Sequence, residues 1–261
     1  MKIASWNVNS VRSRLEHVTN WLQENPVDVL CLQETKVVDA DFPRGDLEAL
    51  GYHTYIYGQK SYNGVALLSQ KPLTQVTTGF ASILPDIKPE WDEQKRIITG
   101  VIDGVRILNL YVPNGSEVDS EKYKYKLGWL NWLQKYLQTL LQTTPDICMC
   151  GDFNIALEDK DIHENVSSIK NHIMSSDAER QALNQLLALG FADAFRKFTE
   201  EGGHYSWWDY RTMAFSRNRG WRIDHHYLTP ELYKKAVSCA IDLEPRKLVK
   251  PSDHAPVIVE F

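Results

Sequence analysis

Short apolar runs rich in β-branched residues recur along the chain and end in polar residues or glycine, as buried strands do. The runs predicted as strands are residues 2–7, 27–33, 64–69, 105–112, 147–151 and 256–261. Apolar residues at helical spacing predict helices over residues 12–24, 120–142 and 177–189. Asp119 or Ser120 is the expected N-cap of the second helix, and Gly190 is expected to end the third. Helices interspersed with many strands indicate an α/β layered fold.

The length favours one domain. A chain of 261 residues can bury either one large α/β core or two small ones. No segment rich in proline, glycine and serine divides it, so we expect a single catalytic domain over residues 1–261.

Composition favours a cytoplasmic protein. The chain begins with strand-like residues, and we expect neither a signal peptide nor a transmembrane span. The four cysteines lie in apolar runs without the paired spacing of a zinc site, and we expect buried, reduced thiols. These cysteines are Cys31, Cys148, Cys150 and Cys239.

The net charge of −5 argues against indiscriminate binding of polyanions, because affinity for phosphates comes largely from lysine and arginine. A surface for nucleic acid would therefore have to be a local patch. Residues 210–222 form such a patch in the sequence, with Arg211, Arg217, Arg219 and Arg222 and no acidic residue. Taken alone, this segment is equally a solvated basic loop.

Several predicted strands end abruptly in a carboxylate, an amide or an imidazole. Strand ends that converge at one edge of a sheet place such groups on a rigid base. The clusters are Trp6-Asn7-Val8-Asn9, Leu32-Gln33-Glu34-Thr35, Tyr111 to Asn114, Gly151-Asp152-Phe153-Asn154, Arg222-Ile223-Asp224 and Ser252-Asp253-His254.

These residue types suit phosphodiester hydrolysis, which needs charge neutralisation, a positioned water and help for the departing oxygen. Each cluster alone is weak evidence. Glu34 could cap a helix or pair with Lys36, Asp152 and Asn154 could form an Asx turn, and Asp253 with the following residue could form a surface turn. The occurrence of all six clusters in one chain favours a hydrolytic site.

The combined motifs resemble the exonuclease III branch of the endonuclease/exonuclease/phosphatase superfamily. The matching motifs run from residue 5 to residue 256: Ser5-Trp6-Asn7-Val8-Asn9, Leu32-Gln33-Glu34-Thr35-Lys36, Tyr111-Val112-Pro113-Asn114-Gly115, Gly151-Asp152-Phe153-Asn154, Gly220-Trp221-Arg222-Ile223-Asp224 and Ser252-Asp253-His254-Ala255-Pro256. The resemblance implies the DNase I-like fold, a four-layer α/β sandwich with two packed mixed β-sheets flanked by helices.

The resemblance also implies a site for Mg²⁺ or Mn²⁺, cations that prefer oxygen ligands and retain several waters. Glu34 would be the principal ligand with Asn7 beside it, and Asn9 and Asp253 would lie close by. The full set of expected metal-site residues is Asn7, Glu34, Asp152, Asn154, Asp253 and His254.

The remaining roles implied by the resemblance concern the water and the phosphate. Asp152 would orient or deprotonate the attacking water, and Asn154 would hold that water or a phosphate oxygen. His254, paired with Asp224, would donate to the phosphate. Tyr111 and Asn114 would reach the scissile phosphate and the leaving side, where the phenol is a candidate proton donor.

Contacts to DNA are implied for Arg12 and for residues 210–222, including Arg211, next to Trp207 and Trp208. Trp207, Trp221 and Ile223 match the family's pocket for a sugar that lacks its base. A normal nucleotide would bring a base too large to enter, so selectivity can come from shape. Taken alone, tryptophans are more often part of a core.

We therefore expect a monomeric DNA repair nuclease that cuts duplex DNA on the 5′ side of abasic sites, with 3′-to-5′ exonuclease and 3′-phosphodiesterase or phosphatase activity. One alternative is a phosphodiesterase or phosphatase of the same superfamily that acts on a non-DNA phosphate ester, since the catalytic core is shared. The other is a DNA-binding protein without catalytic activity.

The sequence departs from the family pattern in two places. His225 and His226 follow Asp224 where relatives usually continue with an apolar strand. We expect satisfied structural histidines, one facing the core and one facing the site, because side chains alternate along a strand. If His225 paired with Asp224, the role of His254 would weaken. The second departure is Asn9, where some relatives carry aspartate, and its amide removes one negative charge from the metal site.

Overall fold

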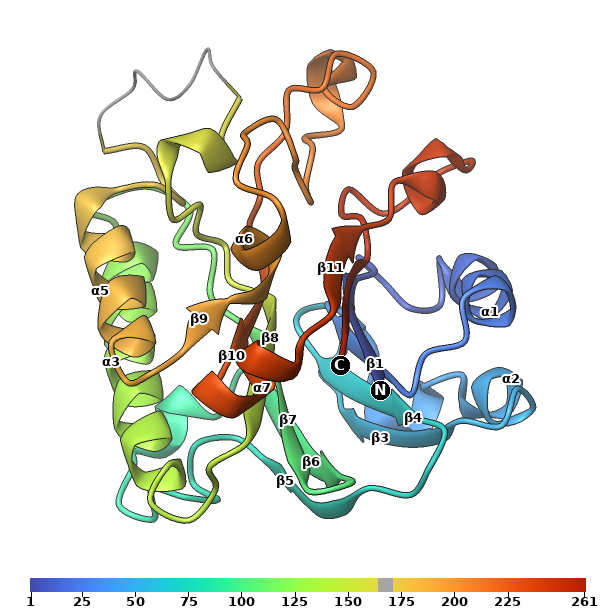
Figure 1. Cartoon of the computed structure of the whole chain (residues 1–261), viewed down its shortest axis with the longest axis horizontal. Helices are drawn as coiled ribbons and strands as arrows, with labels where there is room; N and C mark the ends of the chain where they lie inside the picture. Colours follow the sequence, from blue (N-terminus) through green and yellow to red (C-terminus); the bar gives the residue numbers. More distant parts are fainter. Residues whose placement is uncertain (164–170) are drawn as a thin grey trace.

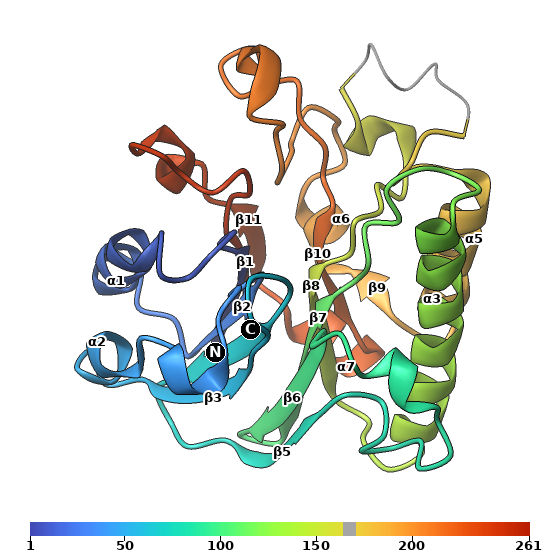
Figure 2. The same cartoon turned by 180° about the vertical axis from the view of Figure 1, so that it is seen from behind.

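Two six-stranded sheets pack face to face, and helices cover their outer faces (Figure 1). The computed structural model describes residues 1–163 and 171–261. The arrangement has four layers, helix, sheet, sheet and helix, as Figure 2 shows from behind. The fold implied by the sequence resemblance is therefore confirmed.

The first sheet has the strand order β11-β12-β1-β2-β4-β3. Only β1 and β2 are parallel among its paired strands in the described residues, and the other pairs are antiparallel. Its strands are β1 (Lys2–Asn7), β2 (Val29–Gln33), β3 (His53–Tyr57), β4 (Val65–Ser69), β11 (Ser238–Ile241) and β12 (Val257–Glu260).

The second sheet has the order β5-β6-β7-β8-β10-β9, in which β7 and β8 run parallel. Its strands are β5 (Thr74–Thr78), β6 (Ile97–Ile102), β7 (Val105–Tyr111), β8 (Ile147–Asp152), β9 (Ala192–Asp193) and β10 (Asp224–Leu228). β10 pairs antiparallel with β8, and this register sets Asp224 opposite Asp152.

Apolar side chains fill the space between the sheets and also the space beneath each helical layer. Ile3 and Cys31 from the first sheet pack with Ile107 and Cys150 from the second. The first sheet's outer face is covered by α1 (Leu15–Glu24) and α2 (Arg44–Glu48), and the second's by α3 (Glu121–Leu140) and α5 (Asp177–Leu187). The short helices α6 (Ala194–Phe198) and α7 (Pro230–Lys235) contact β10.

The two long helices of the second layer begin at serine caps. The Ser120 hydroxyl accepts a hydrogen bond from the Tyr123 backbone N–H, so of the two proposed caps Ser120 is the one used. Ser176 and Glu179 form a reciprocal capping box at the start of α5. No described helix is both long enough and apolar enough to cross a membrane.

The predicted strands and helices all exist, with small differences at their ends. The first helix begins at Leu15 rather than at residue 12, and the third ends at Leu187. Sequence patterns missed β10, whose sequence Asp-His-His-Tyr-Leu is polar although every one of its residues is buried. They also missed the partly exposed strands β3 and β5, the buried strand β6, and the short strands β9 and β11.

Candidate active site

Strand ends from both sheets deliver the predicted polar residues to one edge of the sandwich. Asn7 is the last residue of β1, Glu34 follows β2, and Asp152 is the last residue of β8. Asp224 begins the antiparallel β10, and His254 lies just before β12. The segments that lead into these last two strands project from the same end of the molecule, orange and red in Figure 1.

Asn7 links the two carboxylates at the centre of the site. Its Nδ2 donates to Oε1 of Glu34 at 2.8 Å and to Oδ2 of Asp152 at 2.9 Å. Its Oδ1 accepts from the Asn9 backbone N–H at 3.0 Å. Asn7 is fully buried, so this bridge holds the carboxylates of two different sheets at a fixed separation.

The Glu34 carboxylate also pairs with Lys36, whose Nζ lies 2.8 Å from Oε2. The ion pair that the sequence allowed is therefore present, but it lies inside the site. Burial raises the pKa of Glu34, but Lys36 and the Asn7 amide outweigh it and leave the pKa below its usual value. Glu34 has φ of 51°, a left-handed backbone conformation that non-glycine residues rarely adopt. Strain of this kind is often concentrated at functional sites.

A tight turn after β8 positions Asp152 and Asn154. Oδ1 of Asp152 accepts from the Asn154 backbone N–H at 2.9 Å, so the Asx turn that the sequence allowed exists alongside the bridge to Asn7. Gly151 precedes it with φ of 139°, and a Cβ there would meet the Leu110 carbonyl oxygen at 1.9 Å. Only glycine permits this close approach of β8 to β7.

Asn114 and Asn154 form an amide pair beside Asp152. Asn114 Nδ2 donates to Asn154 Oδ1 at 2.8 Å, and Asn154 Nδ2 donates to the Val112 carbonyl at 3.0 Å. Behind them the buried Lys126 donates to the Asn154 carbonyl at 2.7 Å and pairs with Glu179. Sequence patterns did not predict this support, because Lys126 occupies an ordinary polar position in the helix pattern of residues 120–142.

His254 pairs with Asp224 at the other side of Asp152. Its Nδ1 lies 2.9 Å from Asp224 Oδ2, an oxygen that also accepts from the Ser206 hydroxyl at 2.7 Å. Its Nε2 faces Asp152 Oδ2 at 3.8 Å. Burial lowers the pKa of His254, but the carboxylates of Asp224 and Asp152 reverse this and raise it to about 10. The imidazole is therefore held in its protonated form.

Asp152 is the carboxylate whose protonation changes near neutral pH. Burial raises the pKa of Asp152 to about 7, although His254 and Asn7 act in the opposite direction. A carboxylate of this kind can exchange a proton with a water near neutral pH.

Tyr111 ends β7 next to these groups. Burial raises the pKa of its phenol well above the usual value, and Glu34 adds to the effect. The Arg96 guanidinium lies 4.5 Å from the centre of the ring. Tyr111, Asn114 and Arg96 line a cavity of about 370 Å³ that opens beside the carboxylates.

Of the expected metal-site residues, Glu34, Asp152 and His254 bring one ligand atom each within 4.8 Å of one another. Two carboxylates suit a hard divalent cation, and the protonated His254 suits a phosphate oxygen better than a cation. Asp253 instead accepts from Asn9 Nδ2 and Trp207 Nε1, both at 3.0 Å. Asn9 in turn accepts from Lys36 Nζ at 2.5 Å, so its neutral amide joins Lys36 to Asp253.

A pocket of about 250 Å³ lies next to the site. Trp207 and Trp221 line it, paired through their backbones, and Ile223 is buried in the apolar cluster beneath them. The structure adds His172, which lines the pocket with its ring 5.1 Å from that of Trp221. Sequence patterns did not predict a role for His172, because it lies far along the chain from the tryptophans.

The basic segment divides into exposed and buried arginines. Arg12, Arg217 and Arg219 are exposed, and Arg219 lines the pocket. Arg211 is exposed and paired with Asp209. Arg222 was grouped with them by sequence, and that grouping is wrong.

The guanidinium of Arg222 is buried and pairs with Asp161 and Asp193, each at 2.7 Å. These pairs neutralise both carboxylates inside the protein. The buried guanidinium of Arg222 is therefore not accessible to a DNA phosphate.

The two histidines of β10 are both fully buried and leave opposite faces of the strand, as expected: His226 is on the face that carries Asp152 and Asp224, and His225 packs with Phe153 and Tyr227 on the other. His225 makes hydrogen-bond contacts with Arg222 at 3.0 Å and with the Ile155 carbonyl at 2.9 Å. Burial lowers its pKa to about 4, so it is a neutral structural residue. His254, not His225, is the partner of Asp224. His226 faces the layer between the sheets, where its ring nitrogens have no oxygen or nitrogen partner among the described residues and its polar neighbour is the Cys150 thiol.

Comparison with known proteins agrees with this geometry. Residues 4–254 match the model of the Endonuclease/Exonuclease/phosphatase family. The chain is 34% identical to exodeoxyribonuclease III of Haemophilus influenzae over 272 residues, which cover 100% of both chains.

Two solved structures are similar throughout. One is the 3′ phosphatase NExo from Neisseria bound to a product DNA hairpin, at 41% identity with a TM-score of 0.94, covering 100% of this chain and 99% of that one. The other is an AP endonuclease from Archaeoglobus fulgidus, at 41% identity with a TM-score of 0.92 and the same coverage. The chain therefore belongs to the exonuclease III and AP endonuclease family of hydrolases, and it is an exonuclease III-like DNA repair nuclease.

Proposed function

We propose that this protein hydrolyses DNA phosphodiesters with Mg²⁺ or Mn²⁺, that it incises duplex DNA on the 5′ side of abasic sites, and that it also removes nucleotides and phosphate groups from 3′ ends. The observation that carries the proposal is the joint placement of Glu34, Asp152 and the protonated His254 around one small space. Such a space suits a phosphate group with a metal on one side and a hydrogen-bond donor on the other.

Asp152 is suited to the attacking water. Its Oδ1 is held by the turn at Asn154, while Oδ2 faces His254 and Asn7. With a pKa of about 7 it accepts a proton from water without being permanently protonated. Asn154 and Asn114 hold each other and would orient that water or a phosphate oxygen.

His254 is suited to the phosphate. Asp224 accepts a hydrogen bond from Nδ1–H of the protonated ring, so Nε2–H points toward the site. Donation from Nε2 stabilises the negative charge that builds on the phosphoryl oxygens. Tyr111 lies on the leaving side, where the departing oxygen needs a proton, and its raised pKa keeps it in the donor form.

Glu34 is the group that best fits a divalent metal, with Asn7 beside it. The lowered pKa of Glu34 keeps it ionised at neutral pH, as a metal ligand must be. When bound, Mg²⁺ or Mn²⁺ would neutralise charge on the phosphate. The cation would have to displace Lys36 from the Glu34 carboxylate. The Lys36 ammonium would keep a second acceptor, because its Nζ donates to Asn9 Oδ1 at 2.5 Å.

The balance between abasic-site incision and 3′-end processing is set by the pocket. Trp207 and Trp221 suit a sugar without its base, which favours incision at abasic sites. His172 narrows the same pocket against Trp221, which favours 3′-terminal substrates that need no flipped nucleotide. The similar Neisseria protein is described as a 3′ phosphatase and the similar Archaeoglobus protein as an AP endonuclease, so both activities fit the family.

One experiment compares two labelled duplexes, one with a single synthetic abasic site and one ending in a 3′ phosphate, each with Mg²⁺ or with chelator. We expect both to be processed only with metal, and Glu34→Gln to lose both activities. A preference for a water-soluble phosphate diester over both duplexes would instead support the non-DNA alternative. Cleavage unchanged in Glu34→Ala and Asp152→Ala would show that the cutting comes from a contaminant and that this protein is only a DNA binder.

A further inference from the structure

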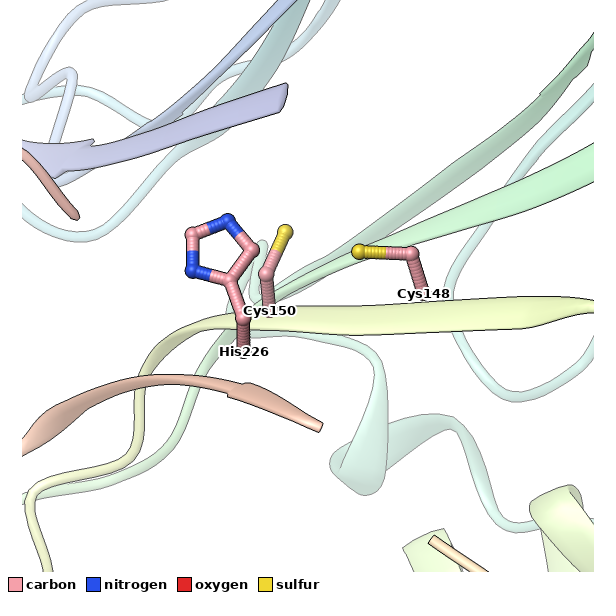
Figure 3. A group of neighbouring side chains, drawn as sticks. All are labelled: Cys148, Cys150 and His226. Carbon is pink, nitrogen blue, oxygen red and sulfur yellow. The ribbon is translucent and has the colours of Figure 1, made fainter. Parts of the chain in front are cut away.

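The layer between the two sheets contains a cluster of sulfur and nitrogen atoms that the proposed nuclease mechanism does not use. Cys148 and Cys150 lie two residues apart on β8, so both side chains leave the same face of the strand. His226 on β10 is the cross-strand partner of Cys150 and projects from that face too. Figure 3 shows the two sulfur atoms and the imidazole gathered beside one another.

The three side chains are close enough to share one ion. One ligand atom from each, the two Sγ atoms and a ring nitrogen, lie within 4.8 Å of one another. In a tetrahedral zinc site, with Zn–S bonds of about 2.3 Å, neighbouring sulfurs are roughly 3.8 Å apart. The cluster therefore needs only a small contraction to reach coordination geometry.

A fourth ligand, the third sulfur, comes from the opposite sheet. Cys31 on β2 has its Sγ 3.5 Å from Sγ of Cys150, so it faces the same cluster across the layer. The thiols of Cys31, Cys148 and Cys150 are free and fully buried. Three sulfurs and one imidazole are a donor set that tetrahedral zinc accepts.

The imidazole of His226 gives an independent indication of a ligand. It is fully buried, and neither ring nitrogen has an oxygen or nitrogen hydrogen-bond partner among the described residues, which leaves the Cys150 thiol as its polar neighbour. Leaving buried polar atoms unpaired costs about 1–3 kcal/mol, so natural structures rarely do it without a reason. His225 next to it makes hydrogen-bond contacts through both of its nitrogens.

We propose that Cys148, Cys150 and His226 bind one Zn²⁺ between the sheets, with Cys31 as the fourth ligand. Three thiolates and a neutral imidazole leave the zinc site with a net charge of −1, far less than separate buried ions would carry, which limits the cost of burial in an apolar layer. Each of those thiols releases its proton to solvent when the sulfur–metal bond forms. The soft donor set selects zinc over the hard cations expected at Glu34.

The location has two consequences. The ion would connect β2 of the first sheet with β8 and β10 of the second, so it would stabilise the packing of the sheets against each other. Because these side chains are fully buried, the ion would enter before the sheets close, during folding rather than afterwards.

The test is refolding of the full chain from denaturant with one equivalent of Zn²⁺ or Co²⁺ under reducing conditions, followed by gel filtration and elemental analysis. We expect about one equivalent of zinc to remain bound, and the cobalt form to show sulfur-to-metal charge transfer with the intense visible bands of a tetrahedral site. Absence of thiolate charge transfer in refolded, nuclease-active wild-type protein would overturn the proposal whatever the variants do.

Variants then assign the ligands. Cys150→Ser and His226→Phe should lose the retained zinc, whereas Glu34→Gln should keep it because the Glu34 site is separate. Cys239→Ser is the matched control, a buried free cysteine outside the three-residue cluster. If Cys150→Ser retains as much zinc as Cys239→Ser, the cluster is not the site and the cysteines only pack the layer. Circular dichroism of each refolded variant separates loss of metal from loss of fold.

Discussion

Oδ2 of Asp152 lies 3.8 Å from Nε2 of His254, and both side chains are buried. A carboxylate with a raised pKa and an imidazole with a raised pKa therefore face each other at a separation only slightly longer than a direct hydrogen bond. The pKa of each group therefore depends on the charge of the other. Their proposed roles can be separated by measurement.

The loss of either group should be severe. We expect Asp152→Ala and His254→Ala each to slow phosphodiester cleavage about 10²-fold or more, the usual scale for a positioned acid–base or charge-stabilising partner. Single-turnover incision of the abasic duplex measures this directly. An effect below about threefold for Asp152→Ala would point to another water-activating group.

The pH profile should be bell-shaped. The active form needs Asp152 ionised and His254 protonated, with pKa values of about 7 and about 10, so the rate should rise through the first and fall through the second. Asp224→Asn removes the main charge that raises the pKa of His254, so the alkaline limb should move to lower pH. An alkaline limb unchanged in Asp224→Asn would show that His254 is not the group that titrates there.

The same pair gives a stability prediction with a defined sign. The folded pKa of His254, about 10, exceeds its ordinary value of 6.5. The stabilisation is therefore complete below about pH 6.5 and is lost as pH rises toward 10. Denaturant unfolding across this range should show wild-type protein losing stability with rising pH, and His254→Gln should show a smaller loss.

The pocket should respond to His172. Replacing it with alanine removes the ring beside Trp221, so the ratio of abasic-site incision to 3′-phosphate removal should rise about 10-fold or more. His204→Ala, at the distant contact with Phe195, is the control and should leave the ratio unchanged. Trp207→Ala should chiefly relax selectivity for the abasic nucleotide. Equal losses on abasic and intact DNA in Trp207→Ala would place the pocket elsewhere.

The two kinds of arginine should behave differently. Arg219→Ala should weaken DNA binding and reduce the slope of log affinity against log salt by about 1, because one phosphate contact is lost. Arg222→Met should instead lower the free energy of unfolding by about 3–5 kcal/mol, since it leaves Asp193 without its ion-pair partner and Asp161 with Arg196 alone. A salt slope changed by Arg222→Met in protein that is still folded would contradict this assignment.

The sequence was sufficient for groups that follow a strand. Asn7, Glu34 and Asp152 come directly at or after apolar runs, so the convergence of strand ends predicts that they meet, and they do. Prediction from the sequence failed for polar side chains that are buried by partners from distant parts of the chain. Arg222 resembles its exposed neighbours in sequence, and only the fold places Asp161 and Asp193 against it. His172 and Lys126 were missed for the same reason, since their partners are far away along the chain.

The pairing of β8 with β10 has a consequence for insertions. Asp152 faces Asp224 and Cys150 faces His226, two positions apart on one face of the ladder. One extra residue inserted in β8 between Cys150 and Asp152 would shift one part of β8 by one residue relative to β10. The side chains of that part would then point to the opposite face of the sheet. Asp152 and Cys150 could not then both face the layer between the sheets. The spacing of two residues between them is therefore constrained by the active site and by the sulfur cluster together.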